Sequence, residues 1–236
     1  MTDTPNLSLP MLAPAQAQKH VTVNEALGRL DGLTQLVLAS VSEVTPPASA
    51  PEGTCYGVPV GAVNDWAGQA GTVAIALGGG WVFAPARRGW RAMVLDAGEP
   101  AMFDGAAWRM GALTLSPGGA ALAMRAVEME VAVTPGASVT TPIAFPARAI
   151  AFGVTGRVVA EITGTATSWT LGVAGDPARY GSGLGLAQNS WVNGPGAPQV
   201  YWAPTTLEIT ATGGDFTGGT LRLVAHFAEL SLPDPV

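Results

Sequence analysis

The C-terminal half of the sequence carries aromatic side chains beside planar hydrogen-bonding groups, a combination that suits sugar recognition. An aromatic ring stacks on the C–H face of a sugar, while carboxylates, amides and guanidinium groups pair with its hydroxyls. Two alternatives stay open: Trp169 and Trp202 are core or subunit-interface residues, and Asp176 and Arg179 pair with each other to fix a loop. The predicted glycan-binding site is drawn from Trp169, Asp176, Arg179, Tyr180, Asn189, Trp191, Asn193, Tyr201 and Trp202.

Residues that could perform catalysis are few. Ser182 lies between glycines in RYGSGLGL, but Tyr180 stands where a nucleophile elbow requires glycine. The same run does not have the glycine spacing of a dinucleotide-binding fingerprint. Acidic residues of β proteins mostly lie on solvated turns and faces, so we expect a protein that is not an enzyme. The carboxylates that could instead form a glycosidase pair are Glu161, Asp176, Glu208 and Asp215.

The composition argues against metal and nucleic-acid binding. His20 and His226 are far apart and Cys55 is the single cysteine, so the sequence has no zinc-ligand spacing and no intrachain disulfide. The net charge is −6, and the 11 Lys+Arg form no basic stripe of the kind that follows a phosphate backbone. We expect no cofactor, no metal and no nucleic-acid partner.

The chain is unusually apolar, with 48% hydrophobic and only 12% charged residues. No apolar run approaches the ~20 residues that cross a bilayer, so we expect no membrane insertion. We assign the surplus apolar surface to contacts between subunits, because obligate interfaces are more apolar than ordinary surface. No secretory signal is recognised. We therefore expect synthesis in a bacterial cytoplasm, with an extracellular role only through assembly into a larger particle or through lysis.

One helix is predicted, close to the N-terminus. Thr22 and Glu25 form a capping box in TVNE, which predicts a helix from residue 23 to about residue 40. Glu25 and Arg29 are spaced for an i,i+4 ion pair on its outer face. The apolar stripe, which we predict to mediate oligomerisation, consists of Val23, Leu27, Leu30, Leu33 and Val37.

This helix needs packing partners, because Gly28 and Gly32 would each cost about 1 kcal/mol in an isolated helix. One alternative is that the helix lies on the sheet of its own domain. The other, which we favour, is a short parallel bundle between identical chains.

The rest of the sequence predicts a mainly β protein of short strands separated by Gly, Pro, Asn and Asp turns. We predict an N-terminal arm with the oligomerisation helix (1–45), a small Trp-rich β-module (53–112), and a C-terminal antiparallel β-sandwich of jelly-roll type (125–236). TPPASAPEG (45–53) and LSPGGAALAM (115–124) are predicted linkers. Residues 78–81 and 103–106 predict hairpin turns. The last strand should place Leu221, Leu223, Ala225 and Phe227 on one face.

The segment LPMLAPAQAQKHVTVNEALGRLDGL resembles the opening signature of an uncharacterised family from phage-like gene clusters. That family includes head-spike proteins of bacterial gene transfer agents and fibre-like proteins of related phages. The resemblance continues through WAGQAG, GGGWVF, GWRAMVLD and FDGAAW, and then through GVTGRVVAEITGTATSWTLGVAGDPARYGSGLGL and LEITATGGDFTGGTLRLVAHFAEL. It spans nearly the whole chain. Met93 stands where a second aromatic residue is expected, which weakens a stacking site in the middle module.

The resemblance implies a particle-attached, trimeric head spike that adheres to the capsular polysaccharide of recipient cells. It also implies that the N-terminal arm, residues 7–18, docks onto a neighbouring subunit or onto a partner such as another head-spike or capsid protein. No catalytic residue is carried over from the family. Two other functions stay open: a structural adaptor that anchors another spike protein to the particle, and a capsule-degrading glycosidase.

Overall fold

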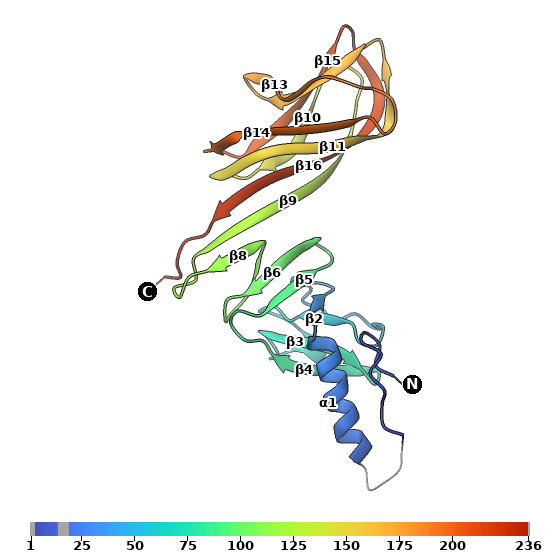
Figure 1. The fold of residues 1–236 in the computed structure, drawn as a ribbon, viewed down its shortest axis with the longest axis vertical. Coiled ribbons are helices and arrows are strands. Elements are labelled where there is room, and N and C mark those ends of the chain that lie inside the picture. The colour runs from blue at the N-terminus through green and yellow to red at the C-terminus, as the bar shows by residue number, and fades with distance from the viewer. Residues whose placement is uncertain (1–2, 14–18, 236) are drawn as a thin grey trace. The chain divides into compact units, whose positions relative to one another are not determined.

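The computed structural model describes residues 3–13 and 19–235, and the chain divides into two compact units. The first comprises residues 1–121 with 233–236, and the second comprises residues 122–232. The described chain is mainly β, as predicted, with one α-helix (Figure 1). The elements of the first unit are α1 (Lys19–Leu33), β1 (Val37–Leu38), β2 (Cys55–Gly57), the 3-10 turn η1 (Asn64–Trp66), β3 (Thr72–Leu77), β4 (Gly80–Pro85), β5 (Arg91–Val94), β6 (Glu99–Phe103), β7 (Trp108–Met110) and β8 (Ala112–Leu115).

Two small sheets make up the first unit, in the strand orders β2-β3-β4 and β1-β5-β6-β7. Both predicted hairpin turns are confirmed, since β3 and β4 flank residues 78–79 and β6 and β7 flank residues 104–107. Gly78 and Gly79 have φ of 62° and 76°, which is the left-handed conformation that a tight hairpin needs. Trp66 is fully buried, with its ring 5.2 Å from Tyr56 and 5.1 Å from Trp81. Aromatic rings therefore supply volume that these short strands lack.

The predicted helix boundaries were wrong at both ends. α1 begins at Lys19, so Thr22 and Glu25 lie inside the helix and do not cap it. It ends at Leu33, and Val37 belongs to β1, which pairs in parallel with β5. Residues 36–38 alternate between buried and exposed side chains, with Val37 43% exposed. That period of two fits the sheet and not a continued helix. The Glu25–Arg29 ion pair is confirmed at 2.9 Å.

α1 lies against β3 of its own unit, and its glycines allow this close approach. A Cβ at Gly28 would lie 2.9 Å from Cδ1 of Leu77, and a Cβ at Gly32 would lie 3.0 Å from Cδ1 of Ile75. The sequence left two alternatives open, a helix that packs on its own domain and a bundle between identical chains. The face of α1 that carries Gly28 and Gly32 packs on its own domain. The contact provides the outside packing that a helix with two interior glycines requires.

The N-terminal arm also binds its own chain. The buried carboxylate of Asp31 on α1 accepts hydrogen bonds from the hydroxyl of Thr4 at 2.6 Å and from the amides of Asn6 at 3.0 Å and Leu7 at 2.6 Å. Residue 7 of the segment expected to dock onto a partner is thus attached through its amide to a buried acid of the same chain, while its side chain is 39% exposed. Residues 14–18 of that segment lie outside the described residues.

Residues 45–53, predicted as a rigid linker between domains, lie within the first unit. The carboxylate of Glu52 accepts hydrogen bonds from the amides of Gly78 and Gly79 at 3.0 and 3.1 Å. The amide of Gly53 donates to the carbonyl of Ala76 at 2.8 Å. These contacts attach the segment to the β3–β4 hairpin. Prolines here fix a surface connection instead of separating two bodies.

The second unit consists of long antiparallel strands in two sheets. One sheet has the order β10-β15-β12-β13, and the strands of this unit in the other follow β14-β11-β16-β9. Buried side chains of both sheets form a single core. The predicted face of the last strand is confirmed, because Leu221, Leu223, Ala225 and Phe227 are all buried. The strands are β9 (Ala121–Ala132), β10 (Ser138–Phe145), β11 (Ala149–Gly164), β12 (Ser168–Val173), β13 (Asp176–Leu184), β14 (Trp191–Tyr201), β15 (Thr205–Thr212) and β16 (Phe216–Leu230).

Candidate functional site

A groove of about 580 Å³ lies on the β14-β11-β16 sheet of the second unit. Val154, Val158 and Val192 belong to the core between the two sheets, so strand alternation puts the side chains of their neighbours Thr155, Arg157 and Trp191 on the opposite face. We refer to this depression as the sheet groove. It is lined by Thr155, Gly156, Arg157, Val158, Val159, Gln188, Asn189, Trp191, Val192, Asn193, Arg222 and Val224.

Strand register places residues of the sheet groove and two acids of the neighbouring strand β9 in two rows. In the first row, Trp191 of β14 is opposite Arg157 of β11, Arg157 is opposite Arg222 of β16, and Arg222 is opposite Glu130 of β9. Side chains directly opposite each other on neighbouring strands have Cβ atoms about 4.5–5.5 Å apart, close enough to interact. The second row runs in the same way through Asn193, Thr155, Val224 and Glu128.

Trp191 gives the sheet groove an exposed aromatic surface. Its side chain is 65% exposed, although tryptophan usually buries most of its large apolar area. Asn189, just before β14, has a left-handed backbone with φ of 68°. Its carbonyl accepts a hydrogen bond from Nη1 of Arg157 at 3.2 Å. This bond links the loop before Trp191 to the neighbouring strand.

The two arginines of the sheet groove differ in their electrostatic environment. Arg222 lies 3.5 Å from the carboxylate of Glu128 and 3.2 Å from that of Glu130, so two acids neutralise it. Arg157 forms no ion pair with any described residue, and its guanidinium meets a backbone carbonyl instead. Positive charge without an acidic partner therefore lies next to the exposed indole of Trp191.

Three residues of the predicted glycan site line the sheet groove, namely Asn189, Trp191 and Asn193. Trp202 is also exposed, at 79%, but it follows the opposite end of β14. The ten residue steps from Trp191 to Tyr201 span about 33 Å of extended strand. The two exposed tryptophans therefore cannot contact the same sugar unit.

The prediction that Trp169, Tyr180 and Tyr201 bind a glycan was wrong, because all three are buried. Nε1 of Trp169 donates to the carbonyl of Gly185 at 2.9 Å. The hydroxyls of Tyr180 and Tyr201 lie 2.9 Å apart, and Phe145 stacks on Tyr201. Burial, followed by the hydrogen bond to Tyr201, raises the pKa of the Tyr180 hydroxyl. Large rings fill the core between the sheets, and each polar tip has an internal partner.

Asp176 and Arg179 pair with each other, which is the alternative that the sequence left open. Their ion pair measures 3.7 Å and joins two residues of β13. The guanidinium of Arg179 also lies 5.7 Å from the ring centroid of Tyr180. Neither residue lines the sheet groove.

Sequence reasoning missed Arg157, Gln188 and Arg222 as groove residues. Alternation in GVTGRVVAEIT indicates that Thr155 and Arg157 share a face, which is a usable signal. The positions opposite them depend on the strand order β14-β11-β16, and no local pattern encodes that order.

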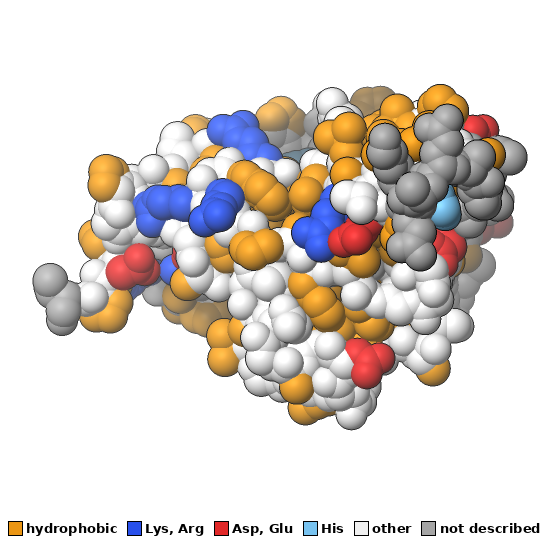
Figure 2. All heavy atoms as spheres, turned by 90° about the horizontal axis from the view of Figure 1, so that it is seen from below, with side chains coloured by type: hydrophobic (Ala, Val, Ile, Leu, Met, Phe, Trp, Pro, Cys, Tyr) orange, Lys and Arg blue, Asp and Glu red, His pale blue; other side chains and the backbone are white. Residues whose placement is uncertain are grey.

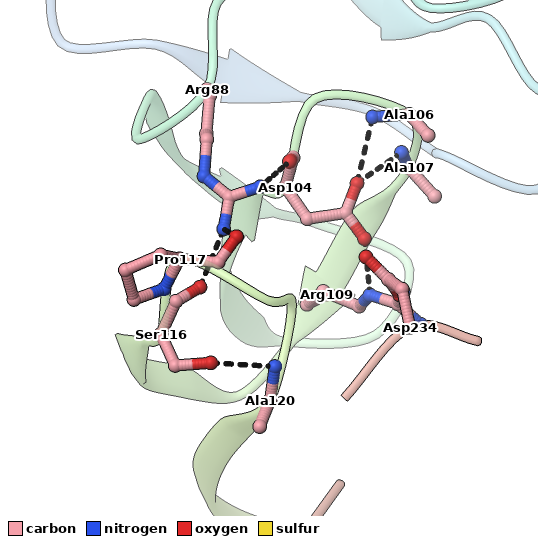
Figure 3. Close-up of polar contacts among 9 residues, drawn as sticks. All are labelled: Arg88, Asp104, Ala106, Ala107, Arg109, Ser116, Pro117, Ala120 and Asp234. Carbon is pink, nitrogen blue, oxygen red and sulfur yellow. Dashed lines mark hydrogen bonds and ion pairs between the residues drawn. The ribbon is translucent and has the colours of Figure 1, made fainter. Parts of the chain in front are cut away.

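A second polar cluster lies in the first unit, around the buried carboxylate of Asp104 (Figure 3). It accepts hydrogen bonds from the amides of Ala106 and Ala107, each at 2.7 Å, and from Nε of Arg109. Burial by itself raises the pKa of this carboxyl. The two amides and Arg109 together lower the pKa by more than burial raises it, so the net pKa lies below the ordinary value. Protein groups thus satisfy this carboxylate, and we assign it a structural role.

Arg88 and Asp234 extend the cluster to neighbouring turns. Arg88 donates to the carbonyls of Asp104 at 2.7 Å and Ser116 at 2.5 Å, and Asp234 lies 3.3 Å from Arg109 (Figure 3).

Among residues 3–13 and 19–235 there is no group of three potential metal ligands. In the same ranges, no helix has the length and apolar character needed to span a membrane.

Comparison with known proteins gives one family match. Residues 23–109 match the model of a family described as "Protein of unknown function (DUF2793)". This segment lies wholly in the first unit and ends before the sheet groove begins. No curated protein matches the sequence.

Among solved structures, the chain is similar to one titled "Cyanophage Pam1 capsid asymmetric unit". The two share 21% sequence identity over 44% of this chain and 84% of that chain, with a TM-score of 0.35. That score is too low to establish a common fold.

Proposed function

We propose that this protein is a non-enzymatic structural spike or fibre of a phage-like gene transfer particle, and that it adheres to cell-surface polysaccharide through the sheet groove. The sequence resemblance to head-spike proteins supports the particle assignment. One structural observation supports the adhesion: the exposed indole of Trp191 lies beside amides and guanidinium groups on a groove that opens to solvent. An aromatic platform flanked by planar hydrogen-bonding groups is the chemistry that sugars require.

Binding is favoured over cleavage by the position of the acidic residues. Glu161, Asp176, Glu208 and Asp215 are not among the residues that line the sheet groove. A glycosidase needs two carboxylates flanking the same glycosidic bond. The two acids that lie beside Arg222 of the groove, Glu128 and Glu130, are paired with it. In the proposed function the second unit, as a β-sandwich of jelly-roll type, serves as the binding head.

We propose in addition that the chain assembles as a homotrimer through the exposed face of α1 and the adjoining β1. Val23, Leu30 and Val37 are 40%, 53% and 43% exposed. Leu27 is half-buried, and Leu33 packs against the core of its own unit. Figure 2 shows hydrophobic side chains scattered over the visible surface among neutral, basic and acidic ones. Exposed apolar side chains such as that of Leu30 suit burial between subunits.

Trimerisation would present three sheet grooves on one particle-bound spike. Linked sites raise the overall avidity even when each site is weak. In the proposed life cycle the protein is made in the bacterial cytoplasm, joins the particle through head-spike or capsid proteins, and leaves the cell by lysis.

The adhesion proposal is tested with purified bacterial capsular polysaccharides immobilised for biolayer interferometry. We expect wild-type protein to bind at least one of them and Trp191→Ala to lose that binding. Trp202→Ala is the matched control, because it removes an equally exposed indole at the other end of β14. If no polysaccharide binds, or if both variants bind like wild type, adhesion through the sheet groove is wrong, and a structural adaptor becomes the better assignment.

Assembly is tested separately by multi-angle light scattering. We expect the mass of three chains for the wild type and one chain for the double variant Val23→Glu, Leu30→Glu, because two buried carboxylates per subunit would be costly to desolvate. A monomeric wild type at high protein concentration would contradict the proposed trimer. It would leave the adhesion proposal intact.

A further inference from the structure

We infer that the sheet groove selects acidic polysaccharides, with a sugar carboxylate bound by Arg157 while the sugar ring rests on Trp191. This inference rests on the proposed function and adds the chemical class of the ligand. It follows from charge and register in the second unit.

Arg157 has unused hydrogen-bonding capacity that faces solvent. A guanidinium group carries five N–H donors in a planar fork. The hydrogen bond from Nη1 of Arg157 to the carbonyl of Asn189 uses one of them, and the side chain is exposed. No described carboxylate lies within ion-pair distance of it. A ligand carboxylate can therefore occupy the remaining fork in the bidentate geometry that arginine favours.

The residues on the two sides of Arg157 differ in chemistry, which fixes how an acidic sugar can lie in the groove. Trp191 is opposite Arg157 on one side, and Arg222 with its two acids, Glu128 and Glu130, lies on the other. A bound acidic sugar would place its carboxylate at Arg157 and its ring on the indole. Glu128 and Glu130 would repel a carboxylate placed further along the row. The arrangement thus favours acidic units whose charge lies close to the stacking ring.

The net charge of the chain opposes binding of a polyanion, so selectivity for acidic sugars has to come from the residues around Arg157. With a net charge of −6 the protein as a whole repels a polyanion. Added salt would screen this repulsion together with the attraction at Arg157. Salt dependence therefore does not separate the two effects, whereas a pair of polymers that differ only in their carboxylates does.

The test compares polygalacturonate with the same polymer after chemical reduction of its carboxyl groups to primary alcohols. Wild-type protein should bind polygalacturonate at least about tenfold more tightly than the reduced polymer, the factor expected for loss of a hydrogen bond to a charged group. Arg157→Gln should weaken binding to polygalacturonate by about the same factor, so that the variant binds the two polymers with similar affinity. Arg29→Gln, which removes one exposed positive charge from α1, is the matched control and should bind both polymers as wild type does.

The outcomes separate this inference from the function on which it rests. If wild type binds the reduced polymer as tightly as polygalacturonate, and Trp191→Ala abolishes both, adhesion stands and the acidic selectivity is wrong. The selectivity is also wrong if Arg157→Gln and Arg29→Gln weaken binding equally, since the effect would then come from net charge. If the wild type binds neither polymer but does bind a neutral capsular polysaccharide, the selectivity alone fails. If it binds no polysaccharide at all, both proposals fail.

Discussion

Replacing Asp31 by alanine should detach the N-terminal arm from α1 and destabilise the first unit. The carboxylate is 1% exposed and accepts three hydrogen bonds, from Thr4, Asn6 and Leu7. A hydrogen bond to a charged group contributes about 1.5–3 kcal/mol. The three bonds share one acceptor group, and the amides of Asn6 and Leu7 are only part-buried, so the contributions do not simply add. We expect a loss of about 3–5 kcal/mol in the free energy of unfolding.

Two measurements check this value. Urea unfolding gives the free energy, and hydrogen exchange reports on the arm, because the amides of Asn6 and Leu7 lose their acceptor when the carboxylate is removed. Glu25→Ala on the same helix is the control. It removes an exposed i,i+4 partner of Arg29 and should cost no more than about 0.5 kcal/mol.

Asp31→Asn tests the role of charge at this site. The amide keeps one oxygen acceptor in nearly the same shape, so an intermediate loss is expected. The reasoning is refuted if Asp31→Ala costs less than about 1 kcal/mol and the amides of Asn6 and Leu7 exchange as slowly as in the wild type. The arm would then be held by contacts other than the buried acid.

Three further predictions concern other buried positions. The pKa of the Asp104 carboxyl is lowered in the folded protein, so the ionised carboxylate stabilises the fold fully above the ordinary carboxyl pKa of about 3.9. This stabilisation disappears as the pH falls through the pKa of the folded state. Asp104→Asn should therefore flatten the acid limb of a plot of urea midpoint against pH, and an unchanged limb would contradict this. Burial, followed by the charge of Asp31, raises the pKa of the Cys55 thiol to about 12, so iodoacetamide at pH 8 should label it in urea and not in the native protein, as mass spectrometry would show. A Cβ at Gly194 would lie 2.0 Å from the backbone oxygen of Tyr180, so Gly194→Ala should cost at least about 3 kcal/mol, whereas Gly196→Ala on the same strand, where the nearest atom would be 3.8 Å away, should leave the urea midpoint almost unchanged.

Local sequence patterns determined those features that need only neighbouring residues. The alternation of Leu221, Leu223, Ala225 and Phe227 fixed the buried face of the last strand, and paired glycines fixed the turn at residues 78–79. The Glu25–Arg29 pair followed from helical spacing. The mainly β character followed from strands and turns of this kind repeated along the chain. Side chains two to four residues apart interact directly in a strand or helix, so their spacing alone predicts them.

The tertiary structure decided which polar and aromatic residues meet at a surface. Trp169 and Trp191 have the same chemistry in the sequence, yet one fills the core and the other lies open in the sheet groove. Arg157 lies opposite both Trp191 and Arg222 only because β11 runs between β14 and β16. Likewise α1 ends before Val37 because β1 pairs with β5, more than fifty residues further along the chain. Strand order and register depend on how distant segments share a core, and no short-range pattern contains that information.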